Sequence, residues 1–230
     1  MPNQLNPSDL VRDAFEFLKI EFGAESVPPP QVALDQSDGS RRFCYDPVSN
    51  IIFLPSNLSE FNAHSLRYMI GEETGHYIHH QITPQLATMR LDLNAKRKAS
   101  QDDNERSRIF VDSVSIDNCG EFVASYAGLL YLKKMAGEQA TRQFAVAALR
   151  KTAKSMSATL NNQDTDFNDE QSFQCVKHGF GYLNAINCFL NHGNRYLKAA
   201  ARVDRMETIN LMMKSPSAFL KTLDEPPAQP

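Results

Sequence analysis

The chain has 230 residues, of which 42% are hydrophobic, so it is long and apolar enough to bury the core of one domain. Its formal net charge of -3 gives no basic field, which argues against nucleic acid or an anionic membrane surface as a partner. No apolar run approaches the roughly 20 residues that span a bilayer, and the polar start has no signal-peptide core, so we expect a cytoplasmic protein with four reduced cysteines.

The first predicted element is a helix. Apolar residues recur at helical spacing from Asp9 to Phe22, Ser8 is the candidate N-cap, and Gly23 ends the pattern. Short apolar runs separated by turn residues follow and predict a small sheet. These runs are residues 31–34, 42–45 and 51–54.

The next predicted helix, from about residue 60 to 81, carries an unusual set of acidic and histidine side chains. At 100° per residue, Glu72, His76 and His79 fall within a stripe roughly 60° wide. Carboxylates and imidazoles are common ligands of divalent metals, so this face indicates a metal site. The full set is Glu72, Glu73, His76, His79 and His80.

The rest of the chain predicts a helical second half. Residues 84–107 are polar and charged, and we interpret them as a mobile insertion or lid. Helical patterns resume over residues 109–135, 138–155 and 173–191, with an acidic loop at 161–169 and a frayed tail at 224–230. The predicted class is a single α+β domain over residues 1–230, predominantly helical, with a small N-terminal sheet.

The segment 72–76 reads Glu-Glu-Thr-Gly-His and resembles the helical zinc motif H-E-x-x-H with its first histidine replaced. The continuation from Gly75 to His79 and the strand-like run at 50–55 also resemble the zincin metallopeptidases, in particular the small gluzincin type. Further on, Glu121-Phe-Val-Ala resembles the E-x-x-A ligand helix of that family. The resemblance covers roughly residues 42–190 and implies a zincin-like fold.

This resemblance implies a metallopeptidase that cleaves a peptide or protein substrate through a metal-activated water. Glu72, His76 and Glu121 would bind one divalent metal ion, and Glu73 would be the general base. Zinc is the first expectation. Manganese and iron are alternatives, because two carboxylates and one imidazole form a harder ligand shell.

The same resemblance implies an oxyanion donor on the late helix, either His178 or Tyr182. The competing interpretation is that His178 lies on the helix surface and that Tyr182 belongs to the core. The sequence leaves both open, and it gives no oligomeric state.

Other functions fit parts of the pattern. Two carboxylates and one neutral imidazole would cancel the charge of a divalent ion, and a neutral metal centre is a poorer Lewis acid. The main alternative is therefore an inactive zincin-like pseudopeptidase that binds a peptide or protein. A second alternative pairs His76 with His80 as ligands, and a third is a di-iron protein, for which Glu73 and His76 supply one E-x-x-H motif and no second one is present. The simplest alternative is that Glu72 and Glu73 are solvated surface acids and that the histidines cap the helix.

Overall fold

Long helices make up most of the structure, a computed structural model that describes residues 6–35, 42–161, 170–193 and 196–224. In chain order the elements are α1 (Pro7–Phe22), β1 (Gln31–Asp35), β2 (Cys44–Asp46), β3 (Ile51–Pro55), a 3-10 turn η1 (Leu58–Glu60), α2 (Ala63–Ile82), α3 (Pro84–Ala99), α4 (Asp103–Ala136), α5 (Glu138–Asn161), α6 (Glu170–His192), α7 (Leu197–Ala200), α8 (Met206–Lys214) and α9 (Pro216–Asp224). The predicted class, α+β and predominantly helical with a small N-terminal sheet, is confirmed.

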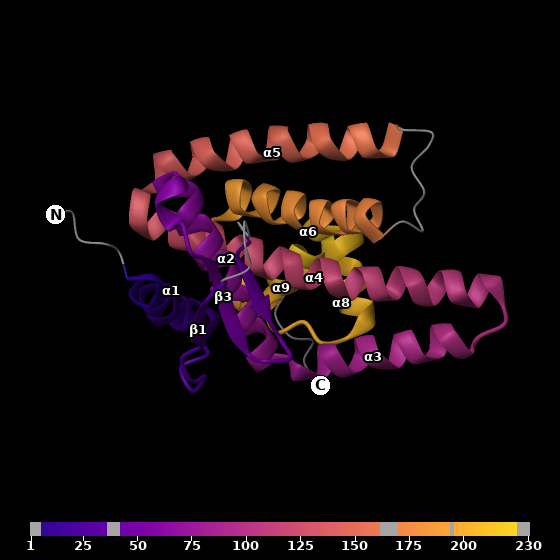
Figure 1. Cartoon of the computed structure of the whole chain (residues 1–230). Coiled ribbons are helices and arrows are strands. Elements are labelled where there is room, and N and C mark those ends of the chain that lie inside the picture. Colours follow the sequence, from indigo (N-terminus) through magenta and orange to yellow (C-terminus); the bar gives the residue numbers. More distant parts are fainter. Residues whose placement is uncertain (1–5, 36–41, 162–169, 194–195, 225–230) are drawn as a thin grey trace.

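Helix α4 runs through the middle of the helical body, with α3 along one side and α6 and α5 along the other (Figure 1). Its most extensive partners are α2 and α6, and its second half is buried almost all round. Because α2 packs between α1 and α4, it too is covered on more than one side. Within the described residues, no helix is both long enough and apolar enough to cross a membrane.

The sheet has three strands in the order β1-β3-β2. Strand β3 is central and buries Ile52 and Leu54, while β1 pairs with it in parallel and β2 pairs with it antiparallel. In the β2 register Tyr45 lies opposite Ile52, but its N–H donates to the side chain of Glu73 on α2, at 2.7 Å. The outer edge of β2 therefore faces the helix that carries the predicted metal ligands.

Helix α1 begins earlier than predicted. Asn6, not Ser8, is the N-cap, because its side chain accepts a hydrogen bond from the Ser8 N–H at 3.2 Å. Pro7 then occupies the first turn, where the missing N–H costs nothing. Gly23 ends the helix in the left-handed conformation (φ 60°), as the sequence indicates.

Helices are longer than the hydrophobic pattern predicts on both sides of residue 100. Helix α3 occupies residues 84–99, where we expected a mobile insertion, and α4 begins at Asp103 instead of near residue 109. Asp102 caps α4 by accepting a hydrogen bond from the Asn104 N–H at 2.9 Å. Movement of residues 84–107 over the molecule stays a prediction. The tail after residue 224 and most of the acidic loop lie outside the described residues.

Glycines bring the backbones of α2 and α4 close together. A Cβ on Gly75 would lie 2.6 Å from the Ala127 Cβ and 3.1 Å from the Ala124 Cα. A Cβ on Gly71 would lie 2.8 Å from the Tyr131 Cβ. Neither position has room for a larger residue, so the spacing of the two helices depends on these glycines.

We expect Gly75→Ala to lower the free energy of unfolding by about 2 kcal/mol, because overpacking outweighs the better helix propensity of alanine. The matched control is Gly120→Ala on α4, where an added Cβ meets nothing within 4 Å. That change should raise the free energy by up to about 1 kcal/mol. Urea denaturation of both variants measures the difference, and equal stabilisation by the two would contradict the close α2–α4 contact.

Candidate active site

A cavity of about 1370 Å³ opens beside the outer edge of β2. Helix α2 and β2 form one wall, and residues of α3, α4, α5 and α6 form the others. Pockets for single small ligands usually measure about 300–1,000 Å³. This cavity is large enough for several residues of a peptide.

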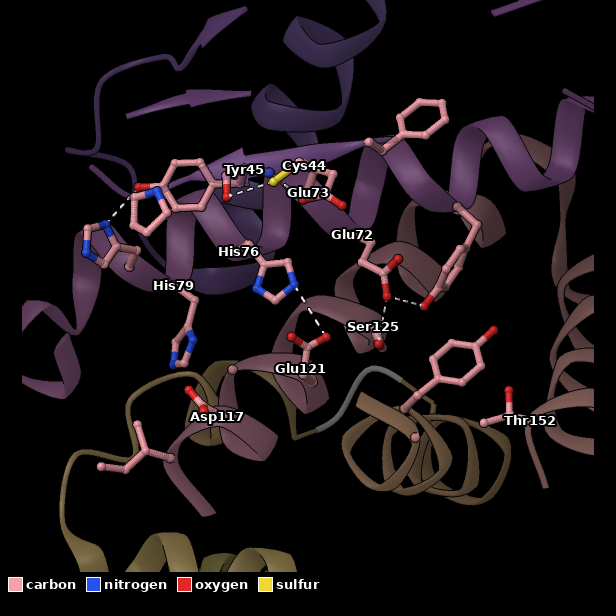
Figure 2. A pocket seen from close by; sticks show the side chains of 18 of the residues that line it. Cys44, Tyr45, Glu72, Glu73, His76, His79, Asp117, Glu121, Ser125 and Thr152 are labelled. Atoms are coloured by element: carbon pink, nitrogen blue, oxygen red, sulfur yellow. Dashed lines mark hydrogen bonds and ion pairs between the residues drawn. The ribbon is translucent and has the colours of Figure 1, made fainter. Parts of the chain in front are cut away.

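The predicted metal ligands Glu72, His76 and Glu121 lie where α2 and α4 face each other (Figure 2). Glu72 and His76 are one helical turn apart on α2, and Glu121 and Ser125 are one turn apart on α4. Each pair therefore points from its own helix toward the other. Glu72, His76 and Glu121, the three predicted metal ligands, all line this one cavity.

Two hydroxyls hold the Glu72 carboxylate by the same oxygen. Its Oε1 accepts hydrogen bonds from the Tyr68 hydroxyl at 2.6 Å and from the Ser125 hydroxyl at 2.9 Å. Burial and the nearby charge of Glu73 raise the pKa of Glu72 to about 7, although the Tyr68 hydrogen bond opposes the shift. This carboxyl therefore holds its proton more readily than an exposed glutamate does.

His76 and Glu121 face each other across the two helices. The His76 Nε2 lies 3.7 Å from the Glu121 Oε2, and the two side chains are 24% and 16% exposed. Burial alone would lower the pKa of His76, but the charges of Glu121, Glu73 and Glu72 raise it to about 9. His76 thus favours the imidazolium form, among three carboxyl groups.

Glu73 and His80 both contact Tyr45 of the edge strand. The Glu73 carboxylate accepts the Tyr45 N–H, and the Tyr45 hydroxyl lies 2.7 Å from the His80 Nδ1. The strand thereby orients the predicted general base. His80 is engaged at the sheet and not with His76, which weakens the alternative in which these two histidines share a metal.

The side chains at this site are of the types that bind divalent ions, and two of them lie at a suitable distance from each other. Two ligands about 2.1 Å from a tetrahedral ion lie about 3.4 Å apart, close to the 3.7 Å between His76 and Glu121. Yet across the described residues, no three His, Cys, Asp or Glu side chains are arranged as a complete metal site. A shared ion would therefore require the Glu72 side chain to turn toward His76 and Glu121.

Of the two predicted oxyanion donors, only Tyr182 has a described side chain. Its ring lines the cavity and packs edge-on against Tyr68, with centroids 5.8 Å apart. Burial and the charge of Glu72 raise the pKa of Tyr182, so its hydroxyl keeps its proton. The side chain of His178 lies outside the described residues, and its predicted role stays a prediction.

Sequence reasoning missed the groups that hold the carboxylates. Tyr68 and Ser125 each lie four residues from a predicted ligand, so helical periodicity could have identified both. Tyr45 could not be found in this way, since it comes from a strand 28 residues before Glu73.

Comparisons with known proteins give no assignment: no family model, no curated protein and no solved structure matches this chain. The site must therefore be interpreted from its own chemistry.

The charge pairing at His76 predicts how stability depends on pH. The folded state raises the pKa of His76 from about 6.5 to about 9, so its stabilising contribution is complete below pH 6.5 and is lost as the pH rises through 9. In chelator-treated protein, the free energy of unfolding should fall between pH 6.5 and 9. Urea denaturation across this range tests the slope.

Glu121→Gln should flatten that slope, because it removes the carboxylate that raises the pKa of His76 most strongly. Glu105→Gln, at an exposed position of the same helix, is the matched control and should leave the slope unchanged. An identical slope in wild type and Glu121→Gln would show that the two side chains are not paired.

Proposed function

We propose that this protein is a metal-dependent hydrolase that cleaves peptide bonds, built on a zincin-like fold. One observation carries the proposal. On the wall of a large cavity, His76 of α2 and Glu121 of α4 face each other at 3.7 Å, beside two further carboxylates and a strand edge. Clusters of like charge are costly to bury unless a cation compensates them, and a divalent ion fits that requirement.

In this proposal Glu72, His76 and Glu121 hold the ion. When bound, a divalent ion lowers the pKa of a water molecule and polarises a substrate carbonyl. The Tyr68 and Ser125 hydroxyls hold one oxygen of Glu72 in the observed arrangement, so binding of the ion requires the Glu72 side chain to turn toward His76 and Glu121.

Glu73 is the proposed general base. It takes a proton from the attacking water and passes it to the leaving amine. The Tyr45 N–H fixes the direction of its carboxylate and lies at the cavity edge where a substrate would pass. Tyr182, whose hydroxyl stays protonated, is the proposed donor to the oxygen of the substrate carbonyl.

Strand β2 supports a peptide as the substrate. Its pairing with β3 uses one edge, while the Tyr45 backbone N–H points to the opposite edge, toward Glu73. The Tyr45 carbonyl lies on that same edge, because the N–H and C=O of one strand residue point the same way. Because Glu73 already accepts the Tyr45 N–H, an extended peptide that adds to this edge would hydrogen-bond to the Tyr45 carbonyl.

A second function, peptide binding without cleavage, has one observation in its favour. With Glu72 in place of a histidine, Tyr68 and Ser125 already satisfy one oxygen, and the His76 imidazolium offsets the charge of Glu121. The cluster is then partly compensated without metal. The cavity and strand edge would serve either function equally well.

Metal analysis separates the two functions. Protein purified without chelator should hold about one equivalent of a divalent ion, whether zinc, manganese or ferrous iron. His76→Ala should lose it. The matched control is His64→Ala at the exposed start of the same helix, which should retain it.

Glu73→Gln tests the catalytic step separately. It should keep the metal and lower kcat for peptide cleavage by roughly 10²–10⁴-fold, the usual contribution of a general base. If the wild-type protein takes up none of the three ions under supplementation, the hydrolase proposal fails. Peptide binding without cleavage then becomes the better account.

A further inference from the structure

His79 presents an unsatisfied nitrogen inside the cavity. The side chain is only 5% exposed, and its Nε2 has no hydrogen-bond partner among the described residues. Figure 2 shows the ring directed away from Glu72 and Glu73, toward the part of the cavity beside Asp117. An unpaired buried polar atom costs free energy, so a native structure that keeps one calls for an explanation.

The position of His79 does not result from a loose helix end. Its backbone carbonyl accepts hydrogen bonds from the Thr83 N–H at 3.0 Å and from the Thr83 hydroxyl at 2.6 Å, which fix the last turn of α2. The backbone that carries the ring is thus held in place, while Nε2 has no partner among the described residues. Burial is also the main cause that lowers the pKa of His79 to about 3, so the ring is neutral at physiological pH.

The surroundings of His79 combine one ion pair with apolar walls. Arg90 of α3 and Asp117 of α4 form an ion pair at 3.2 Å, and both line the same cavity. Leu86 and Ile116 line it as well and are buried. Together these residues form a pocket at the α3 end of the cavity, which we name the His79 subsite.

We propose that the His79 subsite is a specificity pocket that binds an uncharged hydrogen-bonding side chain of a peptide, on the amino-terminal side of the bond to be cleaved. This inference rests on the proposed function. Such side chains are those of serine, threonine, asparagine and glutamine.

The chemistry of the pocket selects this class. Arg90 and Asp117 already offset each other's charge, so the pocket offers no net charge to compensate a charged side chain. A hydroxyl or carboxamide both donates and accepts, and it therefore satisfies Nε2 in either tautomer of the ring. A purely apolar side chain leaves Nε2 unpaired, and sites built around a hydrogen bond reject such analogues strongly.

The direction of β2 places the subsite relative to the scissile bond. Phe43 packs against Phe61 near the start of α2, with ring centroids 5.1 Å apart, whereas Tyr45 contacts His80 near its end. Strand β2 therefore runs in the same sense as α2. A peptide that pairs antiparallel with β2 has its amino-terminal side at the end of α2, where His79 lies.

The test compares wild type with His79→Phe and His79→Leu, which remove the hydrogen bond, and with His79→Gln, which keeps one. Each protein is offered a peptide library randomised around one position. Binding is measured by competition with a fluorescent peptide, and cleavage is measured by mass spectrometry. Wild type should favour serine, threonine, asparagine or glutamine over leucine, aspartate and lysine by about tenfold.

His79→Phe and His79→Leu should lose the preference, and His79→Gln should restore much of it. In the absence of peptide, at least one of the apolar variants should also melt about 2–4 °C higher than wild type, because it removes an unpaired buried atom. A lower melting temperature in both apolar variants would show that His79 already has a partner in the protein, and would overturn the inference.

The two readouts keep this inference separate from the proposed function. A His79-dependent preference in binding, with no cleavage of any peptide, supports the subsite and refutes the hydrolase. Cleavage whose preference is the same in wild type and all three variants supports the hydrolase and refutes the subsite. Failure of wild type to bind any library peptide refutes the subsite as well.

Discussion

The site depends on how closely α2 and α4 approach each other. Gly71 and Gly75 on one helix meet Ala124, Ala127 and Tyr131 on the other, with no space for an added Cβ. Glu72 and His76 each follow one of these glycines in the chain. They therefore lie at the edge of the interface, and their side chains reach toward α4. If the helices moved apart by the width of a methyl group, the His76–Glu121 pair and the Ser125–Glu72 hydrogen bond would be lost together.

Close packing also explains why the charges in the cavity affect each other so strongly. Glu72, Glu73 and Glu121 surround one imidazole, and burial removes the water that would otherwise weaken their repulsion. The Glu72 carboxyl and the His76 imidazolium therefore both hold their protons more tightly, so the pKa of each is raised. A cation placed among these groups would reverse both responses, since it favours the deprotonated forms of Glu72 and His76.

Much of the fold and part of the site were predictable from the sequence, because they follow from periodicity. The helical face with Glu72 and His76 and the small sheet came from local patterns, whereas Glu121 came from the resemblance of its segment to an E-x-x-A ligand motif. The structure places these three residues at one cavity. Helix α3 was missed because its exposed residues carry little hydrophobic pattern, and the role of Tyr45 was missed because strand-to-helix contacts leave no local trace. The metal itself stays a prediction.

Three of the four histidines of α2, namely His76, His79 and His80, show why residue type and spacing do not fix a role. His76 faces carboxylates, which raise its pKa. His79 is buried in the part of the cavity beside Asp117 (Figure 2) and His80 is partly buried beside Tyr45, and burial lowers the pKa of both. The sequence places all three near one helical face, yet they meet three different environments because different elements cover each of them. One helix therefore supplies a charged group, a neutral recognition group and a contact to the strand edge, and this division follows from which element covers each turn.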